Sequence, residues 1–193
     1  MDDRRFSTWL ATILRPPFLL VGLIAKPLYR LLFSRSDESL ARKAEHELAA
    51  DVHTYLPFLF NEMDGRVIPN QGIEFPPPFD YAIVTMDVSQ ILLRFTRGRD
   101  HLAVQVAPKS SPNNFHEVST VLTTLGVPGI QRGSISCLPD ANRVLRQNME
   151  VIAPAFTPEQ YPQLKTQLDE VYARDRVVVK QLETELNRGL YGR

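Results

Sequence analysis

Two alternating apolar runs around a charged turn constrain the fold of this chain more than any other feature. In residues 91–96, and again in residues 101–107, apolar side chains occupy every second position. The turn between the runs contains Gly98, which suits a tight reversal of the chain. Period-two alternation is typical of strands with one buried face. The sequence therefore predicts a hairpin whose core face consists of Ile91, Leu93, Phe95, Leu102, Val104 and Val106.

Further strands and helices are predicted on both sides of this hairpin. Residues 81–88 read as a strand, and residues 66–69 as a short edge strand. Apolar residues at helical spacing predict helices that begin at Ser36, at Asn113 or Asn114, at Pro139 and at Thr157. We therefore expect an α+β fold, in which helices and a long C-terminal helix accompany an antiparallel sheet of three to four strands.

The long C-terminal helix is predicted to run from Thr157 to Gly189, a length of about 45 Å. Its apolar stripe includes Leu164, Leu168, Val171, Val178, Leu182 and Leu186. Asp175 occupies one position of a would-be seam, and the valines at 177–179 widen the stripe beyond a coiled-coil pattern. Two alternatives stay open: packing within the chain, which the pattern favours, and a homodimer formed through this helix.

The first thirty-five residues form an apolar, basic leader in front of a mildly acidic body. They contain six basic and two acidic residues, a net charge of +4, whereas the remaining 158 residues have a net charge of −4. The longest uncharged run, residues 16–25, is shorter than the roughly 20 residues that a membrane-spanning helix needs. Pro16 and Pro17 should break the leader into two helices, and Pro27 should kink the second. We therefore divide the chain into residues 1–35, which associate with a membrane or dock on a partner, and a single α+β domain at 36–193.

Helical phase favours a leader that lies in the membrane interface. Arg15, Lys26 and Arg30 fall within about 60° of one another, and apolar residues cover much of the remaining circumference. Such a helix places its apolar face in lipid and its basic face toward anionic headgroups. The alternatives are a tilted membrane span in which Arg15 and Lys26 snorkel to opposite surfaces, docking on a protein, and burial in an ordinary core. The residues expected to contact the membrane or partner are Trp9, Arg15, Phe18, Leu20, Ile24, Lys26, Tyr29 and Arg30.

The body lacks the sequence motifs of common enzymes and cofactor sites. It has no Gly-x-Ser-x-Gly, Walker or dinucleotide-binding motif, so we expect no catalytic residues and no cofactor. His46 and His53 are seven residues apart, about 10.5 Å along a helix, which is too far for one metal ion. The single cysteine, Cys137, fits a reduced compartment such as the cytoplasm. His101 and His116, with the adjacent Glu117, are a weak basis for acid–base catalysis.

A basic cluster on the hairpin is the candidate docking patch of the body. It consists of Arg94, Arg97 and Arg99, with Lys109 beside them. Guanidinium groups bind carboxylates and phosphates through paired hydrogen bonds, so the patch suits an acidic protein or lipid headgroups. The alternative, which the pattern favours, is a solvated hairpin face. No aromatic side chains alternate with these arginines on the outward face of the hairpin, and we therefore expect no nucleic-acid binding.

One segment carries a resemblance. The run ILLRFTRGRDHLAVQVAPKSSPNNFHEVSTVL, with its hairpin, Pro/Asn loop and helix start, resembles small uncharacterised bacterial α+β domains, some of them similar to toxin-immunity proteins. The resemblance covers about a sixth of the chain and implies binding rather than catalysis. It transfers no site residue to this chain.

These features predict a non-enzymatic protein-interaction module. Its leader should hold it at the cytoplasmic face of the membrane, as a peripheral or monotopic protein on anionic lipids, since basic flanks favour that side. The partner is an unknown protein. The alternative is a soluble assembly subunit whose N-terminal helices dock on a partner or on a second copy, because an exposed apolar segment suits a protein interface as well as lipid.

Overall fold

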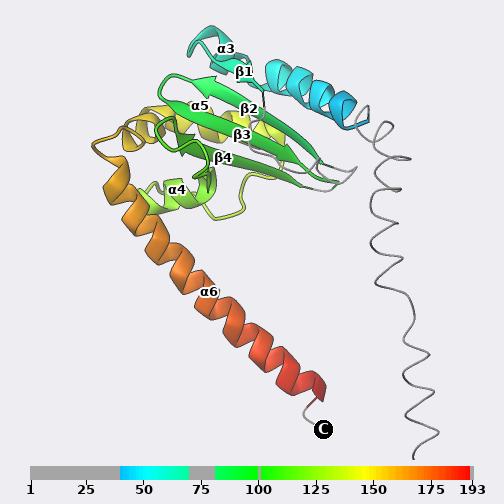
Figure 1. Ribbon diagram of the computed structural model, residues 1–193, viewed down its shortest axis with the longest axis vertical. Coiled ribbons are helices and arrows are strands. Elements are labelled where there is room, and N and C mark those ends of the chain that lie inside the picture. Colours follow the sequence, from blue (N-terminus) through cyan, green and yellow to red (C-terminus); the bar gives the residue numbers. More distant parts are fainter. Residues whose placement is uncertain (1–39, 70–80, 100, 192–193) are drawn as a thin grey trace, which may run out of the picture. The chain divides into compact units, whose positions relative to one another are not determined.

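The computed structural model describes residues 40–69, 81–99 and 101–191, and side chains as far as residue 184. Within these ranges the chain has an α+β fold, as predicted. A single five-stranded antiparallel sheet is packed by helices, and a long helix ends the chain (Figure 1). The predicted leader at 1–35, and with it the boundary between the two predicted domains, lies outside the described residues.

The sheet is a meander, in which the order of the strands in space follows their order in the chain. Its strands are β1 (Arg66–Ile68), β2 (Ala82–Val88), β3 (Ile91–Arg97), β4 (Leu102–Pro108) and β5 (His116–Glu117). The predicted edge strand is thus present as β1. The fifth strand was not predicted, because two residues are too few to produce a recognisable alternation.

The predicted hairpin is confirmed, with Ile91 opposite Pro108 and Arg97 opposite Leu102. Its six alternating apolar residues are all buried. Gly98 leaves room at the turn for the ring of His101, and its backbone angles do not demand a glycine. A Cβ atom at this position would lie 2.3 Å from the imidazole ring of His101, and the Gly98 amide donates a hydrogen bond to the His101 carbonyl.

Pairing of β5 with β4 delays the helix that follows it. The sequence predicted a helix start at Asn113 or Asn114, but α4 begins only at Val118 (Val118–Thr124). His116 lies opposite Val106, and Glu117 lies opposite Gln105. The backbone at these two positions is therefore committed to the sheet before the helix begins.

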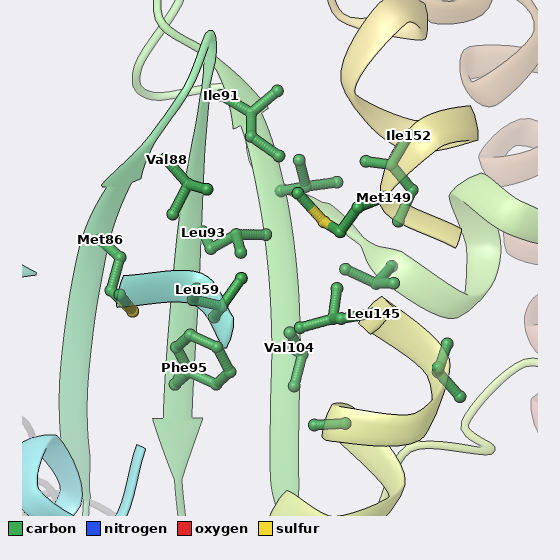
Figure 2. Close-up of a cluster of buried hydrophobic side chains, with 14 of the residues drawn as sticks. Leu59, Met86, Val88, Ile91, Leu93, Phe95, Val104, Leu145, Met149 and Ile152 are labelled. Carbon is green, nitrogen blue, oxygen red and sulfur yellow. The ribbon is translucent and has the colours of Figure 1, made fainter. Parts of the chain in front are cut away.

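Three of the helices that contribute to the core pack on one face of the sheet. They are the helix over residues 40–55, α3 (Pro57–Asn61) and α5 (Leu138–Ala155). Pro57 opens α3, as its missing amide permits, so the first helix ends before it. Figure 2 shows side chains of β2, β3 and β4 pointing toward α5 and α3. Its labelled residues are Leu59, Met86, Val88, Ile91, Leu93, Phe95, Val104, Leu145, Met149 and Ile152.

The last helix, α6 (Tyr161–Tyr191), has 31 residues and begins after a turn at 158–160, four residues later than predicted. It packs beside α4 (Figure 1). Tyr161, Leu164 and Leu168 are buried, which is the intramolecular packing that the sequence favoured. Every described side chain from Arg176 onward is exposed. The body therefore covers only the first turns of this helix.

Candidate functional site

A polar cluster fixes the start of α6 to the short strand β5. The Nε2 atom of His116 lies 3.0 Å from the hydroxyl of Tyr161, and its Nδ1 atom lies 3.4 Å from the hydroxyl of Tyr172. The rings of His116 and Tyr172 are stacked, with centroids 5.9 Å apart. Both imidazole nitrogens thus have a tyrosine partner, which satisfies a buried polar side chain. These contacts define the direction in which α6 leaves the sheet.

Burial controls the protonation of this cluster. Burial lowers the pKa of His116, with the negative charge of Asp169 opposing the effect and the positive charge of Lys165 adding to it. Burial also raises the pKa of the Tyr161 and Tyr172 hydroxyls. The imidazole is therefore favoured in its neutral form and the phenols stay protonated. This set of neutral groups joins β5 to α6.

The possible acid–base group of the sequence does not assemble. His116 and Glu117 are adjacent in β5, but β5 pairs with residues 105 and 106 of β4, whereas His101 precedes that strand. Five residues of strand separate Val106 from His101, about 17 Å. Glu117 instead accepts a hydrogen bond of 2.7 Å from Ser119, whose hydroxyl accepts one of 3.0 Å from the Gly133 amide. Glu117 therefore helps to hold the loop between α4 and α5.

The distal part of α6 carries exposed apolar side chains. Val178 and Val179 are each 52% exposed, and Leu182 is 58% exposed. The last contact with the body before them is an ion pair of 2.5 Å between Asp175 and Arg132. The would-be seam position Asp175 is thus used within the chain, and the stripe beyond it lies open among the described residues. We call Val178, Val179 and Leu182, with the polar side chains flanking them, the distal α6 face.

The three arginines of the predicted docking patch lie in two places. Arg94 points away from the helices, and its guanidinium lies 3.6 Å from the centre of the Phe115 ring. Burial lowers the pKa of Arg94, and its Nε atom has no hydrogen-bond partner among the described residues. Arg97, three residues further along β3, faces the helices and forms an ion pair of 2.7 Å with Asp51. Since alternate residues of a strand face opposite sides, a spacing of three separates these two arginines.

Arg97 and Arg99 do come together, in an open depression of about 380 Å³ beside the start of α5. It is also lined by Asp51, Tyr55, His101 and Cys137. The depression thus combines two guanidinium groups with one carboxylate that already pairs with Arg97. Lys109, the fourth basic residue of the cluster, forms an ion pair with Asp87 on another part of the sheet.

The remaining sequence candidates are dispersed over the surface. Cys137 is exposed, and its thiol donates a hydrogen bond of 3.2 Å to Asp140. This bond is the main cause of a lowered Asp140 pKa. His46 and His53 are both exposed, and no metal-binding group of three or more side chains forms within the described ranges. None of the helices in the described part of the chain is long and apolar enough to cross a membrane.

The cluster of His116, Tyr161 and Tyr172 was not predicted. A weak signal for it existed, because residues 161 and 172 are eleven positions apart, about three helical turns, and therefore share one face of α6. The histidine is supplied by a two-residue strand that the sequence did not indicate.

Comparisons with known proteins add no relative. The sequence matches no family model, and searches of the curated proteins and of the solved structures find no match to this chain. The resemblance of the hairpin segment to small uncharacterised bacterial α+β domains, some of them similar to toxin-immunity proteins, therefore stays a prediction. The expected membrane contacts from Trp9 to Arg30 lie outside the described residues.

Proposed function

We propose that this protein is a non-catalytic interaction module that works at the cytoplasmic face of a membrane. The observation that carries the interaction is the distal α6 face, three large apolar side chains that are each more than half exposed. Large apolar side chains gathered on one exposed face mark contact surfaces in soluble proteins. The polar cluster at the base of α6 supports the same proposal, because it holds the helix in a defined direction.

The location rests on the sequence of the leader. Arg15, Lys26 and Arg30 share one helical side, and the amphipathic rings of Trp9 and Tyr29 suit the depth of the headgroups. Binding should therefore depend both on apolar insertion and on attraction to anionic lipids. Salt should weaken the second contribution and leave the first in place.

The test is flotation of the full-length protein with vesicles of phosphatidylcholine, with and without phosphatidylserine. We expect binding to the anionic vesicles, and a loss of about tenfold or more when Arg15, Lys26 and Arg30 are replaced by Gln, since each basic residue near such a surface contributes about 1 kcal/mol. The matched control replaces Lys43, Arg66 and Arg143 by Gln. These are exposed basic residues of the body, with side chains 74%, 75% and 59% exposed.

The membrane part of the proposal would be overturned if the full-length protein stays soluble without detergent and binds neither kind of vesicle. The alternative, a soluble assembly subunit, would then be favoured. In that alternative the distal α6 face is still the contact surface, since an exposed apolar helix face suits an assembly equally well.

We assign the depression that contains Arg97 and Arg99 as a secondary contact for an acidic surface. Replacing both residues by Ala should change the free energy of unfolding by less than about 1 kcal/mol, because the ion pair of Arg97 is partly exposed. Binding to anionic vesicles should fall and lose part of its salt dependence. Unchanged binding by a stable double variant would remove this depression from the proposal.

A further inference from the structure

We infer that the partner of the distal α6 face is a second copy of this chain, paired with it in antiparallel orientation. The inference rests on the proposed function, because it names the occupant of the same contact surface. Its evidence is the apolar stripe that resumes beyond Asp175 and the charges that flank it.

The stripe that packs on the body resumes beyond Asp175 in the distal helix. At 100° per residue, Val179 and Leu182 lie within about 40° of Leu168, whose side chain is fully buried. The distal α6 face therefore has the pattern of a helix face that packs on a core, but its side chains are exposed among the described residues. Val179 and Leu182 are three residues apart, the spacing of paired core positions in a two-helix seam.

The charged residues beside the stripe have opposite signs, so they attract one another when two copies of the helix pair in opposite directions. Arg176 and Glu183 lie on one flank, four to five residues before and two to three residues after the midpoint between Val179 and Leu182. Neither makes an ion pair within the described part of the chain. A two-fold axis at that point sets Arg176 of each copy beside Glu183 of the other, which gives two equivalent ion pairs.

A parallel pair lacks this complementarity. It brings the flank of Arg176 against the opposite flank, where Val178 and Glu185 stand. Glu185 lies nine residues beyond the level of Arg176, about 13.5 Å along the helix, so Arg176 has no carboxylate at its own level. The charge pattern therefore selects the antiparallel arrangement. The overlap needs only about one and a half heptads, residues 176–185 of each copy, and begins just beyond Asp175, whose ion pair with Arg132 ends the contacts with the body.

Such a short seam is weak by itself, and its strength should depend on location. Helices of this length are marginal unless packing supports them. Two copies held on one membrane surface experience a raised effective concentration, which converts a weak contact into a populated dimer. The inference thus links membrane binding by the leader to contact through the distal α6 face.

The experiment measures association of the full-length protein, labelled for energy transfer and bound to anionic vesicles at graded surface density. Val179→Asp should raise the density needed for half-association about tenfold or more. The matched control is Val177→Asp, which introduces the same charge at a residue of similar exposure, 56%, on the opposite side of the helix. It should leave association nearly unchanged.

Charge reversal tests the orientation. Arg176→Glu and Glu183→Arg should each weaken association about threefold to tenfold, as expected for two exposed ion pairs. The combined variant, in which both charges are exchanged, should restore it. A combined variant that is weaker than either single one would overturn the antiparallel pairing.

Cysteine cross-linking gives an independent test in a Cys137→Ser background. A mixture of Val179→Cys and Leu182→Cys copies should form mixed disulfides, because these positions face each other across the antiparallel seam. Disulfides within each variant alone would indicate a parallel pair instead. Monomers at every surface density would overturn the inference, whereas the proposed function stands or falls on vesicle binding, which is measured in the same samples.

Discussion

Leu168 and Leu182 lie on the same face of α6, yet the first is fully buried and the second is 58% exposed. Their sequence surroundings are alike, since each continues one apolar stripe at helical spacing. The difference comes from what lies opposite: β5 and α4 reach the first turns of the helix and not the later ones. An amphipathic pattern therefore indicates that a face is made to be covered. It does not identify the cover, which can be the same chain or another one.

Substitution of these two leucines is the strongest test of the comparison. Leu168→Ala should lower the free energy of unfolding by about 2–5 kcal/mol, the usual cost of truncating a buried leucine. Leu182→Ala should change it by less than about 0.5 kcal/mol in dilute solution, where copies are separated. Urea denaturation of both variants in parallel gives the values. A large loss for Leu182→Ala would show that another part of this chain covers the distal face.

The polar cluster at the base of α6 should show a smaller effect. Tyr161→Phe removes the partner of the His116 Nε2 atom and should cost about 1–3 kcal/mol, because a buried nitrogen then lacks a hydrogen bond. Tyr172→Phe is the matched control. The Tyr172 hydroxyl lies further from the His116 imidazole, 3.4 Å from its Nδ1 atom, so this substitution should cost less. Equal losses, or none, would mean that ring packing rather than hydrogen bonding joins α6 to β5.

The same cluster predicts a dependence of stability on pH. Burial lowers the pKa of His116 below its usual value of 6.5, so the unfolded chain binds its proton more readily than the folded one. The contribution of His116 to the free energy of unfolding should stay constant above pH 6.5. It should fall as the pH drops below that value, because the unfolded chain then takes up the proton first. His116→Gln should remove this contribution, and His46→Gln, at an exposed site, should leave it. The difference between wild type and variant, measured by urea denaturation across pH 5–8, isolates the effect.

The sequence predicted most of the fold because most of it is periodic. The hairpin at 91–107, the strand β1 and the helix α5 follow from alternation, helical spacing and proline positions. The strand β5 did not follow, since its two residues are defined by pairing with β4 and not by any pattern of their own. That omission also hid the cluster around His116, because the histidine reaches Tyr161 only from this strand.

The arginine patch shows a different limit. Proximity in sequence grouped Arg94 with Arg97, although strand geometry alone places residues three apart on opposite faces. The link of Arg97 to Asp51 joins positions 46 residues apart, and no local signal contains it. Periodicity thus predicts faces well, whereas the partners across a face require the tertiary structure.

The smallest expected effect lies at the boundary between the covered and uncovered parts of α6. Asp175 binds Arg132 at 2.5 Å, and both side chains are partly exposed, at 48% and 38%. Arg132→Ala should therefore lower the free energy of unfolding by only about 0.2–1 kcal/mol, less at high salt. Hydrogen exchange should nevertheless quicken in the turn around Asp175, because this pair is the last tie between α6 and the loop before α5. Arg174→Ala breaks only a pair with Glu170 inside the same exposed helix and is the control. Equal increases in the exchange rate for both variants would contradict this role of the Arg132 pair. The boundary of the covered part of α6 would then be set by the ring contacts of Tyr172.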